Sequence, residues 1–84
     1  MTEAVYFDGL SSRAHAVSLS VDDGHLRIRG DITRDEPLSG LRWGERLGSA
    51  PRRVELGDGA YCELGDHAAF ERLQAEAGLT TSWV

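Results

Sequence analysis

The sequence predicts a small α+β domain that is mostly β, with six or seven short antiparallel strands in a bent sheet or partial barrel and one C-terminal helix. Apolar and polar residues alternate in short runs, and turn residues separate these runs at intervals of about eight to twelve positions, as in antiparallel β proteins. Residues 66–77 instead repeat their apolar residues at helical spacing. A single amphipathic helix has to bury its apolar face against the sheet, so we expect one domain over residues 1–79.

The N-terminal half of the chain contains three predicted strands, over residues 4–7, 15–21 and 26–29. The second and third flank Asp22-Asp23-Gly24, where glycine accepts the positive φ that a tight hairpin needs. Gly30 allows a bend or bulge where the third strand ends. We expect a further short strand at Ile32-Thr33 and a polar turn over residues 34–37.

The C-terminal half contains the clearest hairpin, which follows a loop over residues 44–50. Pro51 belongs at the start of a strand, because proline cannot donate a hydrogen bond to a sheet. The hairpin turns at Gly57-Asp58-Gly59. Asp66 is the expected N-cap of the helix, and Gly78 is the expected residue at which the helix ends. The predicted inward positions of the hairpin are Val54, Leu56, Ala60, Cys62 and Leu64.

Six or seven strands followed by one helix is the layout of pleckstrin-homology-like (PH-like) domains. An SH3-like barrel with an appended helix is the alternative.

Composition excludes several classes of function. The net charge of −5 and the absence of lysine argue against a nucleic-acid partner, because affinity for phosphate backbones depends on basic residues. A single cysteine excludes an intramolecular disulfide. No window approaches the roughly 20 apolar residues of a membrane-spanning helix.

The residues that carry chemistry do not form a recognisable catalytic or metal-binding motif. His15, His25 and His67 lack the spacing of a HExxH helix, and they do not pair with cysteines at zinc-ligand spacing. Cys62 lies on the inward side of a predicted strand, where a small buried thiol is the usual case. The sequence therefore predicts a domain that is not an enzyme and has no cofactor.

Arginine supplies the candidate binding residues. Arg27 and Arg29 share the outer face of one predicted strand, whereas a second group lies within residues 42–53. If the two groups converge, they could bind an acidic peptide or a lipid headgroup, because guanidinium groups match carboxylates and phosphates. The alternative is that these arginines pair with surface carboxylates. The candidate residues are Arg27, Arg29, Trp43, Arg46, Arg52 and Arg53.

Three motifs carry a resemblance to a known family: YFDGLSSR at residues 6–13 with His15 behind it, ERLGSAPRR at residues 45–53, and GDG at residues 57–59 followed by CEL at residues 62–64. In order and spacing they resemble the N-terminal domain that precedes the membrane segment of proteobacterial HtpX/Ste24-like zinc metallopeptidases. The resemblance covers roughly residues 4 to 84. The chain contains no HExxH motif, so none of the catalytic residues of that family carries over.

The resemblance implies a non-catalytic accessory domain on the cytoplasmic side of the bacterial inner membrane, with residues 80–84 beginning a linker to a membrane segment. Its partner would be the peptidase domain of its own parent chain, another peptide or protein, or the membrane surface. The alternative function is a free-standing PH-like module that binds a ligand or a lipid headgroup through its arginine face.

Overall fold

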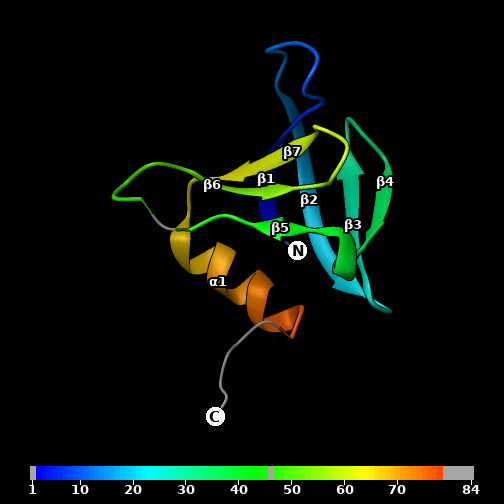
Figure 1. Ribbon diagram of the computed structural model, residues 1–84, viewed down its shortest axis with the longest axis vertical. Coiled ribbons are helices and arrows are strands. Elements are labelled where there is room, and N and C mark those ends of the chain that lie inside the picture. The colour runs from blue at the N-terminus through cyan, green and yellow to red at the C-terminus, as the bar shows by residue number, and fades with distance from the viewer. Residues whose placement is uncertain (1, 46, 79–84) are drawn as a thin grey trace.

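The computed structural model describes residues 2–45 and 47–78, which form seven antiparallel strands and one α-helix (Figure 1). The strands pair in the order β4-β3-β2-β1-β7-β6-β5. Strands β5–β7 cross β2–β4 at a steep angle, so the sheet curls into a half-barrel. This architecture confirms the predicted fold class. The elements are β1 Thr2–Phe7, β2 His15–Asp22, β3 His25–Gly30, β4 Arg34–Pro37, the 3-10 turn η1 Leu38–Gly40, β5 Arg42–Trp43, β6 Arg52–Glu55, β7 Tyr61–Leu64 and α1 His67–Glu76.

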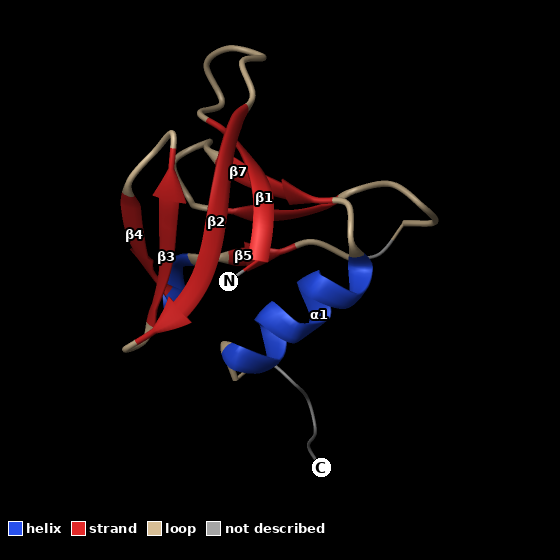
Figure 2. Ribbon diagram, turned by 180° about the vertical axis from the view of Figure 1, so that it is seen from behind, coloured by secondary structure: helices blue, strands red, loops and turns tan. Residues whose placement is uncertain are grey.

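The inner face of the half-barrel holds the hydrophobic core. Because side chains alternate between the two faces of a strand, every second residue points inward. The predicted inward positions of the second hairpin are all buried, and so are Leu26 and Ile28 of β3. Helix α1 lies across one end of the curled sheet (Figure 2) and adds Phe70 and Leu73 to the same core.

Local signals set both ends of α1, as the sequence predicts. The carboxylate of Asp66 accepts hydrogen bonds from the backbone N–H groups of Ala68 and Ala69, at 3.0 and 3.2 Å. These bonds satisfy two amide groups that have no partner within the helix. Gly78 follows the last turn with a φ of +77°, a conformation that glycine adopts without strain.

The prediction of a strand at Ile32-Thr33 and a turn over residues 34–37 is wrong. Residues 34–37 form β4, which pairs with β3, and Arg34 and Glu36 lie opposite the inward-facing Ile28 and Leu26. The two charged side chains therefore face the inner side of the sheet. A strand of this composition is stable there because the Nε of Arg34 donates to Glu36 at 2.6 Å.

The same guanidinium joins β4 to two distant parts of the chain. It donates to the hydroxyl of Tyr6 in β1 at 3.0 Å and to the carboxylate of Asp58, in the turn between β6 and β7, at 2.8 Å. Burial lowers the pKa of Arg34, but the hydrogen bonds to Glu36, Tyr6 and Asp58 outweigh it and raise that pKa. Arg34 thus ties the β4 side of the half-barrel to its β6–β7 side.

Two of the predictions concern residues that the structure does not describe. Arg46 and the linker expected at residues 80–84 lie outside the described residues. Within residues 2–45 and 47–78, no helix is long and apolar enough to cross a membrane.

Candidate functional site

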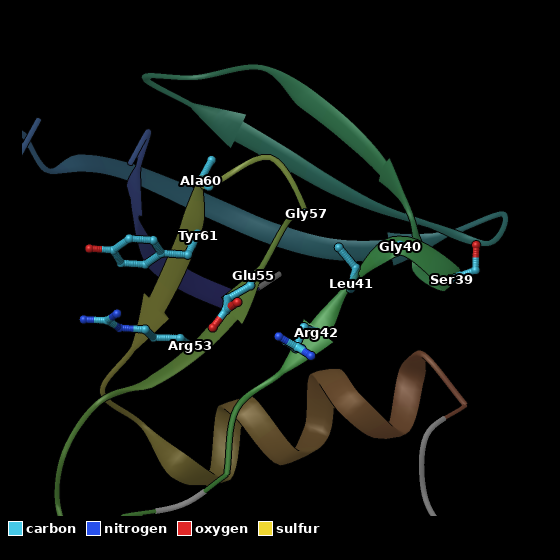
Figure 3. A pocket seen from close by; sticks show the side chains of 10 residues that line it. Ser39, Gly40, Leu41, Arg42, Arg53, Glu55, Gly57, Ala60 and Tyr61 are labelled. Atoms are coloured by element: carbon cyan, nitrogen blue, oxygen red, sulfur yellow. The ribbon is translucent and has the colours of Figure 1, made fainter. Parts of the chain in front are cut away.

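A hollow of about 550 Å³ lies on the outer face of β5, β6 and β7 (Figure 3). We call it the outer hollow. One side is formed by η1 and the start of β5, and another by the glycines of the turn at residues 57–59. The side chains that give it chemical character are Ser39, Leu41, Arg42, Arg53, Glu55 and Tyr61.

Two contacts hold the guanidinium of Arg53 in place. Its Nε donates to the carboxylate of Glu63, the residue opposite it on β7, at 3.1 Å. Its guanidinium lies over the ring of Tyr61, 4.4 Å from the centroid, and Tyr61 in turn stacks on Phe7 with 5.1 Å between ring centroids. Arg53 therefore presents a positive charge at a fixed place on the rim of the outer hollow.

Arg42 and Glu55 differ from Arg53 because neither charge is paired with another side chain among the described residues. They are direct cross-strand partners between β5 and β6, and both are exposed. Within the described part of the chain, neither forms an ion pair. The outer hollow consequently offers one positive and one negative group side by side.

Arg27 and Arg29 lie elsewhere, on the outer face of β3, and they are already paired. Arg27 contacts Asp22 at 3.4 Å and Asp35 at 2.9 Å, and Arg29 contacts Asp35 at 2.7 Å. The hydrogen bond from Arg29 lowers the pKa of the Asp35 carboxyl group. Strands β2, β1 and β7 separate β3 from β6 in the sheet, so the structure does not bring these two arginines next to Arg53.

Arg52 points inward, and only 8% of its surface is exposed. Its guanidinium lies over the ring of Phe70 at 4.0 Å, donates to the carbonyl oxygen of Gly44 at 3.1 Å, and approaches Glu71 at 3.5 Å. Trp43 packs edge-on against the same ring, with 5.6 Å between centroids. Arg52 and the indole of Trp43 thus join the sheet to α1 and leave little surface for a ligand.

Cys62 and the histidines do not line the outer hollow. Cys62 is fully buried, and burial raises the pKa of its thiol to about 12. His25 lies 2.8 Å from the carbonyl oxygen of Asp23, whereas both ring nitrogens of His67 are buried without a hydrogen-bond partner. Among the described residues, no group of three or more His, Cys, Asp or Glu side chains could hold a metal ion.

Sequence reasoning placed Arg42 and Arg53 in the second arginine group but kept only Arg53 of the two as a candidate binding residue, and it did not select Glu55 or Tyr61. The alternation in the second hairpin does place Arg53, Glu55 and Tyr61 on one outward face. The alternation does not predict that β5 pairs with β6, and this pairing is what brings Arg42 opposite Glu55.

Comparison with known proteins identifies a family without an assigned activity. No curated protein and no solved structure matches the chain. A family profile described as "Domain of unknown function (DUF7092)" matches residues 1–77. That description mentions no peptidase, so the resemblance to HtpX/Ste24-like N-terminal domains stays a hypothesis. Because the match spans most of the 84 residues, the chain belongs to the DUF7092 family.

Proposed function

We propose that the chain is a non-catalytic interaction domain that binds a peptide or protein segment at the outer hollow. The observation that carries this proposal is the exposed pair of opposite charges, Arg42 and Glu55, at a hollow of about 550 Å³. Pockets of a few hundred cubic ångströms with a small number of placed polar groups are typical binding sites. The fixed guanidinium of Arg53 adds a second anion-binding group at the rim.

The raised pKa and the burial of the Cys62 thiol support the proposal that the domain is not catalytic. A cysteine nucleophile acts as the thiolate, and the pKa of about 12 keeps Cys62 protonated at neutral pH. Cys62 is also fully buried, which separates it from any substrate.

A ¹H–¹⁵N NMR titration with a pool of random decapeptides tests binding at the outer hollow. We expect chemical-shift changes concentrated at residues 39–42, 53–55 and 57–61. Arg42→Ala should weaken these changes, whereas Arg13→Ala, a matched loss of one exposed arginine in the loop between β1 and β2, should not. Shifts spread over the whole surface, or no shifts at all, would contradict the proposal.

We further propose, on the sequence resemblance, that the domain is an accessory module of a membrane-bound zinc metallopeptidase and sits on the cytoplasmic side of the membrane. Its partner would then be the peptidase domain of its own parent chain. Reading the coding sequence that follows Val84 tests this directly. A hydrophobic span and a HExxH motif are expected, and the absence of both would contradict this assignment.

Binding of a lipid headgroup through the arginine face is less well supported, because Arg27 and Arg29 already have carboxylate partners. Sedimentation with vesicles that contain an acidic phospholipid separates the two functions. The peptide proposal predicts no salt-sensitive vesicle binding. Binding that Arg53→Glu abolishes would favour the lipid function instead.

A further inference from the structure

We propose that the outer edge of β5 accepts an extended strand from a partner protein, in which an apolar residue is followed directly by an acidic residue. This inference rests on the proposed function and names the chemistry of its partner. It depends on three observations: the difference between the two ends of the sheet, the direction of the backbone groups of β5, and the order of charges across β5–β7.

The two end strands of the sheet differ in how well they are protected against pairing. Strand β4 consists of Arg34, Asp35, Glu36 and Pro37. Charged residues and proline on an edge strand discourage the addition of another strand. The three charged residues are held in ion pairs, so the protection is built into the fold. Strand β5 contains only Arg42 and Trp43, so its protection is limited to its short length and one charge, and it has no proline.

The backbone of β5 has one residue whose polar groups point outward. The N–H of Gly44 donates to the carbonyl oxygen of Arg53 at 2.8 Å, just beyond the end of β5. Hydrogen-bonded and non-hydrogen-bonded pairs alternate in an antiparallel ladder. The Arg42–Glu55 pair is therefore hydrogen-bonded and the Trp43–Val54 pair is not. The N–H and C=O of Trp43 consequently point away from β6, and no backbone bond to them is found within the described residues.

An added antiparallel strand would pair both of these groups of Trp43 with one residue of the partner. The next partner residue would lie opposite Arg42 in a non-hydrogen-bonded pair, the arrangement that brings side chains closest. Tyr61, Glu55 and Arg42 already form a row across β7, β6 and β5. An acidic side chain continues this row, because it places Arg42 between two carboxylates and gives its guanidinium a fork-shaped acceptor.

The partner residue opposite Trp43 would face the same side of the sheet as the indole. That side is apolar, since Trp43 packs on Phe70 of α1. An apolar side chain is therefore favoured at this position, directly before the acidic one. Because Arg42 also lines the outer hollow, the bound strand would run along the rim of that hollow.

The probe is the capped peptide TVTVETVT, whose central valine–glutamate step has the required pattern. We expect it to bind, to slow hydrogen exchange at the backbone amide of Trp43, and to shift the Arg42 signals. The lysine counterpart TVTVKTVT should bind about two- to twentyfold more weakly, because an opposite-charge cross-strand pair becomes a like-charge pair. Arg42→Glu should reverse this preference, and Arg13→Glu, with the same change in net charge, should preserve it.

Backbone methylation of the peptide separates strand addition from binding by side chains alone. Methylation of the valine nitrogen before the glutamate removes the N–H that would donate to Trp43, and we expect binding to be lost. Methylation of the glutamate nitrogen, which would point away from β5, is the matched control and should weaken binding less. Equal affinity of the two methylated peptides would overturn the proposed edge pairing.

The outcomes also distinguish this inference from the proposed function. Peptide-induced shifts at the outer hollow without protection of the Trp43 amide would refute strand addition and leave the interaction domain standing. If neither the decapeptide pool nor TVTVETVT binds, both proposals are wrong.

Discussion

Replacement of Phe70 by alanine should destabilise the domain more than a typical point mutation. The ring is fully buried in the core that α1 shares with the sheet. Truncation of a buried phenylalanine costs about 3–5 kcal/mol, because apolar contacts are lost and a cavity remains. A domain of 84 residues unfolds with roughly 4–13 kcal/mol, so the loss is a large share of the total.

Replacement of Phe70 by leucine separates the volume of the side chain from its aromatic character. Leucine keeps most of the apolar volume but removes the edge-on contact with Trp43 and the face beneath the Arg52 guanidinium. An aromatic pair contributes about 0.5–1.5 kcal/mol beyond its buried area, and a desolvated cation–π contact contributes about 2 kcal/mol. We therefore expect Phe70→Leu to cost about 2.5–3.5 kcal/mol.

Urea denaturation followed by far-UV circular dichroism measures both losses as shifts of the midpoint at constant slope. A double-mutant cycle of Phe70→Leu with Arg52→Met isolates the contact between the two side chains, with an expected coupling of about 0.5–2 kcal/mol. A loss below about 1 kcal/mol for Phe70→Ala, or no coupling with Arg52, would refute the packing of α1 described above.

Three further predictions follow from single sites. Gly30→Ala should cost more than about 1 kcal/mol in urea denaturation, because φ is +139° and a Cβ would lie 2.6 Å from a carbonyl oxygen of β2; Gly24→Asn, in open space at a φ of +74°, should cost less, and equal losses would contradict this reading. The pKa of Asp58 is lowered from its usual 3.8, mainly by the hydrogen bond from the backbone N–H of Ala60 and next by the hydrogen bond from Arg34. The ionised carboxylate therefore stabilises the fold above about pH 4, and this stabilisation is lost as the pH falls through the lowered pKa. Denaturation midpoints between pH 7 and pH 2.5 should show a smaller acid loss for Arg34→Gln, and an unchanged loss would argue against the ion pair. Iodoacetamide at pH 8 should alkylate Cys62 slowly in the native protein and rapidly in denaturant, because the thiol is buried and its pKa is about 12; equal rates would contradict the burial.

Much of the fold could be predicted because the deciding signals are local. The turn at Asp23-Gly24 has positive φ at both residues, as a tight hairpin requires. The alternation in β6 and β7 identifies the buried face without knowledge of the partner strands. The cap at Asp66 bonds to amides two and three residues away. Each of these features depends on residues that are neighbours in the chain.

The misassigned strand β4 shows where local signals fail. Residues 34–37 have the composition of a turn, and they form a strand because the charge of Arg34 is satisfied by Tyr6 and Asp58, which are 28 and 24 residues away in sequence. Arg52 was selected as a binding residue because it is an arginine beside Arg53. Strand alternation turns it inward, and the aromatic ring of α1 beneath it makes burial of its charge tolerable.

The sequence alone determines the alternation and the buried face of β2, β3, β6 and β7, the tight turns between them and the ends of the helix, because propensity, periodicity and capping act over a few residues. Only the tertiary structure decides the strand order, and with it the pairing of β5 with β6, the separation of Arg27 and Arg29 from Arg53, and the outward-pointing backbone groups of Trp43. These features arise from contacts between segments far apart in the chain, and such contacts leave no trace in local spacing.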